Sequence, residues 1–306
     1  MIYTVTLNPA IDYIMTLPRF TEGAVNRSSS EEIFFGGKGI NVSVILNRLG
    51  VPSTALGFTA GFTGQAIEQG ISSQGIATDF IHLPSGSSRI NIKLRTTQET
   101  EINGQGPSIS PHGLEQFFQK LNTIQSNDIL VLAGSVPSSL PNDIYSQILS
   151  CLSDRGILFA ADAAGALLTN VLQYRPFLIK PNHIELGEIF GTEITTPDQA
   201  VPYARKLQDQ GAKNVLVSMG PQGAVLLDEN GEVTKMKAPA GKAVNSVGAG
   251  DSMLAGFIAG YLSRHDCFYA LALATAAGTA TALSEGLADK ELIYRLLEEV
   301  YLLNEK

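Results

Sequence analysis

Short apolar runs alternate along most of the chain with stretches in which apolar residues recur at helical spacing. The runs predict buried strands at Ile2–Leu7, Ile129–Ala133, Leu158–Ala161, Phe177–Ile179 and Val215–Ser218. The helical spacing predicts helices at Lys38–Leu49, Gly64–Gln74, Pro111–Thr123, Pro141–Ser153, Pro197–Gln210, Gly250–Leu262, Phe268–Ser284 and Lys290–Leu303. Alternation of strands and helices predicts an α/β fold, with a mostly parallel sheet covered by helices on both faces.

Two segments, at about 11–35 and 89–102, have a different pattern, in which polar and apolar residues alternate. The run from Arg89 to Thr96 shows it clearly. A period of two residues is typical of strands with one face in water, which do not fit a sheet buried on both faces. We therefore expect these segments to form a smaller β-structure outside the main sheet.

Composition narrows the class of protein. The chain has 306 residues, of which 44% are hydrophobic and 16% are charged, as in a soluble α/β domain. No linker or repeat marks a second domain, so we expect one domain over residues 1–306. The net charge of −8 argues against nucleic-acid binding, which usually requires a basic surface. Anionic ligands would have to be held by a few local cations.

The chain shows no sign of a membrane or an oxidising compartment. Its two cysteines, Cys151 and Cys267, are far apart in apolar surroundings, as expected for free thiols in a reducing cytoplasm. The N-terminus lacks the pattern of a signal peptide. The most apolar region, Phe268–Leu283, is short for a membrane span and rich in Ala, Gly and Thr. We expect a cytoplasmic protein without a membrane segment.

The segment Asn245–Ser252 places a carboxylate in a glycine-rich loop before a long apolar helix. Gly248 and Gly250 have no Cβ, so backbone N–H groups there can approach a ligand closely. A helix N-terminus favours phosphate through its free N–H groups and its dipole. Asp251 beside such a phosphate would suit the removal of a proton from an attacking hydroxyl. Taken alone, Asp251 is equally well explained as an ordinary acid in a first helical turn.

A second glycine cluster, Gly36–Asn41, opens the helix predicted at Lys38–Leu49. Lys38 and Asn41 are three residues apart and share one side of its first turn. The cluster is not a P-loop, because the spacing G-x-x-x-x-G-K-[ST] is absent. No G-x-G-x-x-G follows the first strand either, so a dinucleotide-binding fold has little support.

Together the two segments resemble the paired signatures of the ribokinase-like sugar kinases, the phosphofructokinase-B family. The first signature centres on G-G-K-G-x-N and the second on G-A-G-D-x-x-x-x-G, which Gly248–Gly256 matches. The resemblance extends over essentially the whole chain. It implies a ribokinase-like three-layer sandwich with a mostly parallel central sheet and a small β-sheet lid over the sugar site. Many members pair through their lids, so we expect a homodimer.

The resemblance implies that Asp251 is the catalytic base. Together with Gly248, Ala249 and Gly250 it would form the catalytic loop, in which backbone N–H groups from Ala249 to Asp251 surround the transferred phosphate. We expect the helix N-terminus to lower the pKa of Asp251. A weak base is sufficient if the hydroxyl becomes acidic only late in a loose transition state.

The resemblance places ATP against the segment Ser218–Gly223, for which an ordinary Gly-Pro hairpin is the alternative. Asn182 and Glu185 match the family's N-x-x-E element and would help to hold Mg²⁺, largely through water, as that ion prefers. The region from Thr275 to Thr279 would line the adenine pocket or simply pack in the core. The expected ATP-binding residues are Lys180, Asn182, Ser218, Gly220, Gly223, Gly250 and Thr279.

The sugar site is expected near the first glycine cluster. Asp12 matches the family acid that binds sugar hydroxyls. Arg27 and Arg89 lie in the two lid segments and Lys38 in the glycine loop, which is more cations than a neutral sugar requires. An arginine fork suits a phosphate, so we expect an acceptor that is already phosphorylated. The alternative, a solvated strand residue, is preferred only for Arg95. The expected substrate-binding residues are Asp12, Arg27, Gly37, Lys38, Asn41 and Arg89.

Within the family, the run Arg89–Lys93, followed by Glu99–Asn103 and Gly106-Pro107, resembles the enzymes that act on fructose 1-phosphate. The expected reaction is phosphoryl transfer from ATP to O6 of fructose 1-phosphate. Tagatose-6-phosphate kinases, which act at O1, share much of this framework and are the alternative. Ribokinase or adenosine kinase is a poorer match, because a neutral acceptor does not need lid arginines. A non-catalytic sugar-phosphate sensor would gain nothing from Asp251.

Overall fold

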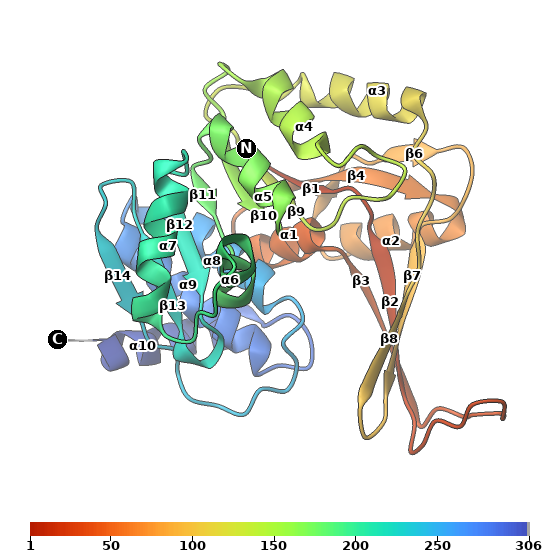
Figure 1. Ribbon diagram of the computed structural model, residues 1–306. Coiled ribbons are helices and arrows are strands. Elements are labelled where there is room, and N and C mark those ends of the chain that lie inside the picture. Colours follow the sequence, from red (N-terminus) through yellow and green to blue (C-terminus); the bar gives the residue numbers. More distant parts are fainter. Residues whose placement is uncertain (305–306) are drawn as a thin grey trace.

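The main β-sheet forms the centre of the molecule (Figure 1). The computed structural model describes residues 1–304. The strands of this sheet are β1 (Ile2–Thr6), β4 (Thr54–Ala60), β5 (Ala77–Thr78), β6 (Ile81–Leu83), β9 (Ile129–Ala133), β10 (Leu158–Asp162), β11 (Leu178–Ile179), β12 (Asn214–Ser218), β13 (Ala224–Leu227) and β14 (Val233–Met236). Their order is β14-β13-β12-β11-β10-β9-β1-β4-β5, with β6 beside β4. All pairs are parallel except β12–β13 and β13–β14.

Helices cover both faces of this sheet. They are α1 (Lys38–Arg48), α2 (Gly61–Ser72), α3 (Pro111–Leu121), α4 (Ile144–Leu152), α5 (Ala166–Val171), α6 (His183–Phe190), α7 (Pro197–Asp209), α8 (Ala249–Arg264), α9 (Cys267–Ala282) and α10 (Lys290–Asn304). Two short 3₁₀ turns are η1 (Leu172–Tyr174) and η2 (Gly220–Gln222). Each predicted helix and strand is present, with ends shifted by a few residues. The sequence prediction missed β4, whose apolar run is interrupted by Gly57, and the short elements α5, α6, β5, β6, β13 and β14.

Successive side chains of the central strand β9 pack into different layers. Leu130 and Leu132 pack with α3, α4, α5, α6 and α7. Ile129 and Val131 pack with α1, α8, α9 and α10 on the opposite face. Because neighbouring residues of a strand point to opposite faces, a run that is apolar throughout must be covered on both sides. The three-layer arrangement follows from this continuous hydrophobicity, and the predicted fold class is confirmed.

A second sheet, here called the lid sheet, projects from one side of the main body (Figure 1). Its strands are β2 (Ala10–Thr16), β3 (Ser30–Gly36), β7 (Arg89–Arg95) and β8 (Glu99–Asn103), in the order β3-β2-β7-β8. Segments 11–35 and 89–102, which have the alternating pattern, therefore lie outside the main sheet. Among residues 1–304, none of the helices combines the length and the apolarity that a bilayer crossing requires.

Candidate active site

Functional side chains gather at the carboxyl ends of the parallel strands. Asn8 follows β1, Asp162 ends β10, Lys180 follows β11 and Ser218 ends β12. Because these strands are parallel, their carboxyl ends lie along one edge of the sheet, where open α/β sheets bind their ligands. The lid sheet starts at the same edge, since β2 begins at Ala10, shortly after β1. Residues from both sheets therefore meet here.

Asp251 and Asn41 come together at the centre of this region. Asp251 lies in the first turn of α8, and Asn41 lies in the first turn of α1, which packs against α8. Asn41 Nδ2 donates a hydrogen bond of 2.7 Å to Asp251 Oδ2. Gly248 caps α8 in the left-handed region, with φ 79°, and a Cβ there would lie 2.6 Å from Leu287 Cδ2. Only glycine fits both requirements without strain.

The pKa of Asp251 lies opposite to the sequence expectation. The pKa is raised from 3.8 to about 6, chiefly by burial and secondly by repulsion from Asp162. The hydrogen bond from Asn41 and the charges of Lys38 and Lys180 act in the other direction but are outweighed. The expected lowering by the helix N-terminus was wrong, because desolvation of a fully buried carboxylate dominates. A pKa near neutrality makes Asp251 a stronger base than an exposed aspartate.

Asp162, which the sequence analysis did not select, bridges two lysines beneath Asp251. Its Oδ1 lies 3.2 Å from Lys38 Nζ, and its Oδ2 lies 3.1 Å from Lys180 Nζ. Burial alone would raise the pKa of Asp162, but the two ammonium groups outweigh it and hold the pKa below its usual value. The signal that could have found Asp162 is an acid at the carboxyl end of a buried strand.

Burial would likewise lower the pKa of Lys38. The attraction of Asp162 and Asp251, with a smaller contribution from Glu185, outweighs the burial, and the pKa is raised. Lys38 therefore stays charged in a pocket that contains three carboxylates. The charges of Lys38, Asp162 and Asp251 therefore influence one another's pKa values.

The first turn of α8 offers backbone N–H groups to an anion. Over the part of the chain that the structure describes, the N–H groups of Gly250 and Asp251 have no hydrogen-bond acceptor. The N–H of Ala249 donates instead to the carbonyl of Ser246 at 3.3 Å, so its expected place in the anion hole is not supported. A Cβ at position 250 would lie 3.0 Å from Lys180 Nζ, which places that ammonium group beside the same turn.

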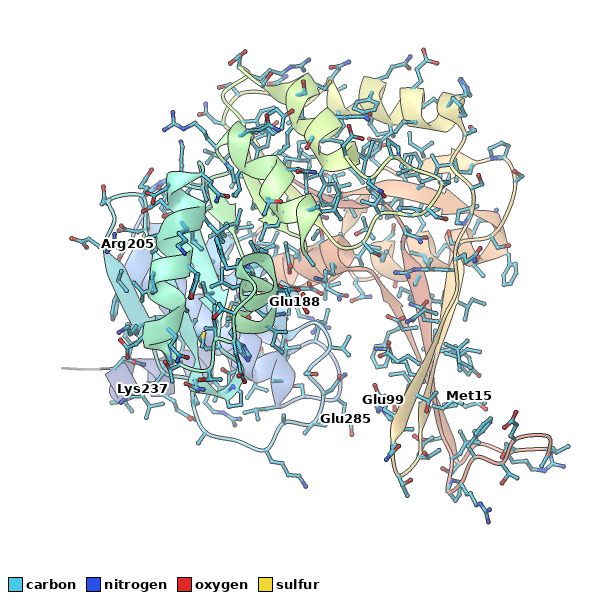
Figure 2. The ribbon with its side chains drawn as sticks, in the orientation of Figure 1. Met15, Glu99, Glu188, Arg205, Lys237 and Glu285 are labelled. Carbon is cyan, nitrogen blue, oxygen red and sulfur yellow. The ribbon has the colours of Figure 1, made fainter. Side chains whose placement is uncertain are left out.

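Asp12 lines a cavity of about 370 Å³ between the lid sheet and the main body. Asn91, on the neighbouring strand β7, donates a hydrogen bond of 2.8 Å to Asp12 Oδ1. Asn41 lines the same cavity, so it extends to the partner of Asp251. At the other end it is lined by Glu99 of the lid sheet and Glu285 of the facing loop (Figure 2).

A second cavity, of about 340 Å³, adjoins the glycine cluster, and the charged residues that line it, Lys38 and Arg89, are both cations. It is lined by Thr6, Asn8, Gly37, Lys38, Arg89, Ala133, Gly134, Ser135, Ala164 and Leu167. Arg89 is largely buried, which holds its pKa below the usual value, and its Nε donates to the Asn8 carbonyl at 3.0 Å. Gly37 has φ 135°, and a Cβ there would lie 2.4 Å from Thr6 Cγ2, so a larger residue is excluded. Ser135 was not selected in the sequence analysis.

Arg27 does not join Arg89 in this cavity. Arg89 pairs with Ala10 at the start of β2, whereas Arg27 is exposed in the loop between Thr16 and Ser30 at the far end of that strand. A seven-residue strand is about 20 Å long. The expectation that both arginines meet one phosphate was therefore wrong for a single chain. The distance between Arg27 and Arg89 could not be read from the sequence, because it arises from the length of the lid sheet.

Arg95 makes ion pairs with two lid glutamates, Glu32 at 3.5 Å and Glu99 at 3.6 Å. Its charge is balanced within the lid sheet. This agrees with the preference for a strand residue over a phosphate ligand at this position.

Asn182 and Glu185 form the capping box of α6. Asn182 Oδ1 accepts hydrogen bonds from the N–H groups of Ile184 and Glu185, and Glu185 Oε2 accepts one from the N–H of Asn182 at 2.8 Å. In residues 1–304, no three His, Cys, Asp or Glu side chains are grouped to hold a metal. Mg²⁺ bound to nucleotide phosphates keeps several waters and needs only one or two carboxylates, so Glu185 beside Lys38 fits such an ion.

The expected nucleotide loop is a compact turn between β12 and β13. Ser218 ends β12, and Gly220 lies in η2 with φ 58°. A Cβ at Gly223 would lie 1.9 Å from the Met236 carbonyl, so this glycine has a purely structural requirement as well. The turn thus has the form of the ordinary Gly-Pro hairpin that the sequence analysis gave as the alternative. It follows the carboxyl end of β12, so a nucleotide loop at this position is still compatible with the structure.

On α9, Thr279 is half-buried and Thr275 is fully buried. The hydroxyl of Thr275 has no hydrogen-bond partner among the described residues. Core packing and an adenine pocket both remain compatible with this helix face.

Known proteins match this chain in sequence and in structure over nearly its whole length. Residues 5–292 match the family of pfkB carbohydrate kinases. The 1-phosphofructokinase of Bacillus subtilis is 48% identical over 300 residues, covering 98% of each chain. The D-tagatose-1-phosphate kinase of Bacillus licheniformis is 38% identical over 290 residues, which are 94% of this chain and 95% of that protein. The crystal structure of a proposed phosphofructokinase from Staphylococcus aureus superposes with a TM-score of 0.87, at 43% identity and 97% coverage of each chain.

Proposed function

Because the chain belongs to the pfkB family of carbohydrate kinases, we propose that it transfers the γ-phosphoryl group of ATP to O6 of fructose 1-phosphate. The products are fructose 1,6-bisphosphate and ADP. The observation that carries this proposal is the buried Asp251 carboxylate, which lies beside an unpaired helix N-terminus and near a cavity containing Lys38 and Arg89. The relative named 1-phosphofructokinase, at 48% identity, supports the choice of acceptor.

In the proposed reaction, Asp251 accepts the proton of the acceptor's 6-hydroxyl, and Asn41 orients the carboxylate. The hydroxyl oxygen bonds to the γ-phosphorus as the bond from that phosphorus to the bridging oxygen breaks, and the electron pair leaves with ADP. The N–H groups of Gly250 and Asp251, with the ammonium group of Lys180, stabilise the charge of the phosphoryl group in transit.

The existing phosphate of the acceptor would occupy the cavity that contains Lys38 and Arg89. Among the described residues, only Nε of Arg89 makes a hydrogen bond, so the other guanidinium N–H groups are available for a bidentate contact. The hydroxyls of the sugar would meet Asp12 and Asn91 at the base of the lid sheet. This arrangement suits a phosphate on C1, at the opposite end of the sugar from the reacting C6.

Glu185 is the residue best placed to hold Mg²⁺, through water. The ion would neutralise charge on the phosphates of ATP. The chain's own share of that neutralisation comes from Lys180, which lies beside Gly250 in the first turn of α8 and pairs with Asp162.

A homodimer through the lid sheet is part of the proposal. Ile33, Tyr13, Ile92 and Ile102 form one row across β3, β2, β7 and β8. Ile33 and Ile102 are more than half exposed, at 54% and 55%. An open apolar sheet face is usually covered by a partner. In such a dimer Arg27, which cannot reach Arg89 in its own chain, would be available to the partner's site.

Tagatose 1-phosphate is the second candidate acceptor, because one relative is named a D-tagatose-1-phosphate kinase. Tagatose differs from fructose only in configuration at C4, so its C1 phosphate and 6-hydroxyl would occupy the same positions. Tagatose 6-phosphate would place its phosphate in the same cavity of Lys38 and Arg89 and its 1-hydroxyl at Asp251, so the site geometry fits it as well. The relative named 1-phosphofructokinase, at 48% identity, is what favours a C1 phosphate.

The proposal is tested by measuring ADP release with fructose 1-phosphate, fructose 6-phosphate, tagatose 1-phosphate, tagatose 6-phosphate, fructose and ribose. We expect the highest kcat/KM with fructose 1-phosphate. A higher value with either tagatose phosphate would change the acceptor but leave the kinase assignment intact. A preference for an unphosphorylated sugar would overturn the role of Lys38 and Arg89 in binding phosphate.

A further inference from the structure

Asp162 has no part in the proposed proton transfer, yet it is the most enclosed charge in the site. Its side chain is 2% exposed, and that of Lys180 is 4% exposed. Taking Asp162 and Lys180 out of water costs free energy that their mutual attraction offsets only when the geometry is good, whereas the Lys38 side chain stays 42% exposed. Hydrophobic residues would fill the space of this buried pair at least as well for stability alone, so the pair calls for another explanation.

The two lysines belong to different halves of the site. Lys38 begins α1 and lines the cavity that also contains Arg89, where the acceptor phosphate is proposed to lie. Lys180 follows β11 and lies beside Gly250 in the first turn of α8, where the transferred phosphoryl group is proposed to lie. Asp162 contacts one lysine with each carboxylate oxygen.

The backbone around Asp162 leaves it little freedom. Its carbonyl accepts a hydrogen bond of 3.1 Å from the N–H of Gly134, whose own carbonyl accepts one of 2.9 Å from the buried Tyr145 hydroxyl. A Cβ at Gly134 would lie 3.5 Å from Lys38 Cβ, so the stem of Lys38 rests on the same segment. Movement of Asp162 would therefore displace both ammonium groups.

We propose that Asp162 is a positioning residue that couples the acceptor half of the site to the phosphoryl-transfer half through Lys38 and Lys180. This inference rests on the proposed kinase function. Asp162 touches neither reactant; it sets the distance between two ammonium groups that do. Its negative charge also raises the pKa of Asp251 and so makes that carboxylate a stronger base.

The charged groups that face Asp251 are Asp162, Lys38 and Lys180, and Asn41 donates its hydrogen bond. Of the charges, Asp162 has the largest effect, and it raises the pKa of Asp251. Removing that negative charge must therefore lower the pKa of Asp251 and extend activity to more acidic pH. A residue that only supported the fold would not move the pH profile in this way.

The test is the full-length Asp162→Asn enzyme, assayed with ATP and the acceptor that the wild-type enzyme uses best. We expect kcat to fall about 10- to 100-fold, as for a misplacement of the reacting groups, with KM raised for both substrates. The acidic limb of kcat/KM should move down by at least about half a pH unit. Asp128→Asn is the matched control, because Asp128 binds the N-terminal ammonium group just before β9, at the opposite edge of the sheet.

Asp162→Asn leaves the buried Lys180 without a counter-charge and could prevent folding. The double variant Asp162→Asn with Lys180→Gln removes both charges, and its pH limb should still move down, by less, because Asp162 outweighs Lys180 at Asp251. An unchanged limb together with unchanged KM for either substrate, in whichever variant folds, would overturn the proposal. Inactivity of the wild-type enzyme towards every sugar phosphate would refute the proposed function instead.

Discussion

Asn41 and Asp251 are 210 residues apart in sequence and are joined by a hydrogen bond of 2.7 Å. Each lies in the first turn of its helix, and the helices pack side by side. The two glycine clusters of the sequence therefore form one site. The bond fixes which oxygen of Asp251 remains available, since Oδ2 accepts from Asn41.

Replacing Asn41 should shift the pH dependence of the reaction upward. The hydrogen bond from Asn41 stabilises the charged form of Asp251, so Asn41→Ala raises the pKa of Asp251 above about 6. The acidic limb of kcat/KM, measured by ADP release from about pH 5 to 8.5, should move to higher pH. Asn47→Ala on the same helix is the control, because Asn47 binds the Gln74 carbonyl at the surface. An unaltered limb in Asn41→Ala would argue against Asp251 as the base.

Asp251→Asn should lower kcat by at least ~10², which is the usual contribution of a general base. Binding of ATP should change little, because the N–H groups of the first turn of α8 remain in place. Isothermal titration with a non-hydrolysable ATP analogue and steady-state assays separate the two effects. A variant with the kcat of the wild-type enzyme would exclude Asp251 from proton transfer.

The same substitution should stabilise the protein at neutral pH. The pKa of Asp251 is about 6 when folded and near 3.8 when unfolded, so the folded state binds more protons between these values. The contribution to stability is present below about pH 3.8 and is lost as the pH rises through about 6. Thermal unfolding should show a higher Tm for Asp251→Asn at pH 7.5 than for wild type, and a smaller advantage near pH 4. Equal Tm differences at both pH values would contradict the raised pKa.

Arg89→Ala should weaken binding of the phosphorylated acceptor. A hydrogen bond to a charged group is worth ~1.5–3 kcal/mol, which is about 10- to 150-fold in KM. KM for ATP should remain within a factor of about two, because Arg89 lines only the acceptor cavity. Arg95→Ala is a matched control on the same strand, since its partners are Glu32 and Glu99. Similar effects of both substitutions on KM would mean that the role of Arg89 is structural.

Ile102→Glu should disrupt the proposed dimer. Ile102 is 55% exposed at the edge of the apolar row on the lid sheet, where a buried carboxylate would be unfavourable. Light scattering at micromolar concentration should show a dimer for wild type and a monomer for the variant. Phe268→Glu, at an exposed apolar position on α9, is the control and should remain dimeric. A wild-type protein that is monomeric and fully active would exclude the lid dimer.

Much of the fold could be predicted because its causes are local. The apolar runs of β9 and β12 are buried on both faces, and that requirement is visible in the sequence itself. The alternating run of β7 distinguishes it from the buried strands, so the separate lid sheet was also predictable, but its polar Asn91 and Lys93 are buried while Ile90 is exposed. Among the elements that were missed, β4 is interrupted by glycine, and α6, like the others, is too short to show a period.

The site could be predicted only in part. Motif spacing selected Asp251, Asn41 and Lys38, because glycine turns and helix starts have a sequence signature. Asp162 lies in no glycine motif, and beyond its place at the end of a buried strand it acquires its role from two lysines that are 124 and 18 residues away along the chain. Asn91 beside Asp12 depends likewise on the pairing of β2 with β7.

The sequence by itself determined which local structures form and which groups could carry charge to a phosphate. The tertiary structure decided the protonation of Asp251 and the separation of Arg27 from Arg89. The pKa of Asp251 depends on how completely water is removed and on which charges remain nearby, and both are properties of the packed site. The reach of Arg27 depends on the length and direction of a sheet assembled from distant segments. Residue types set the available chemistry, while distance and burial in three dimensions set its strength.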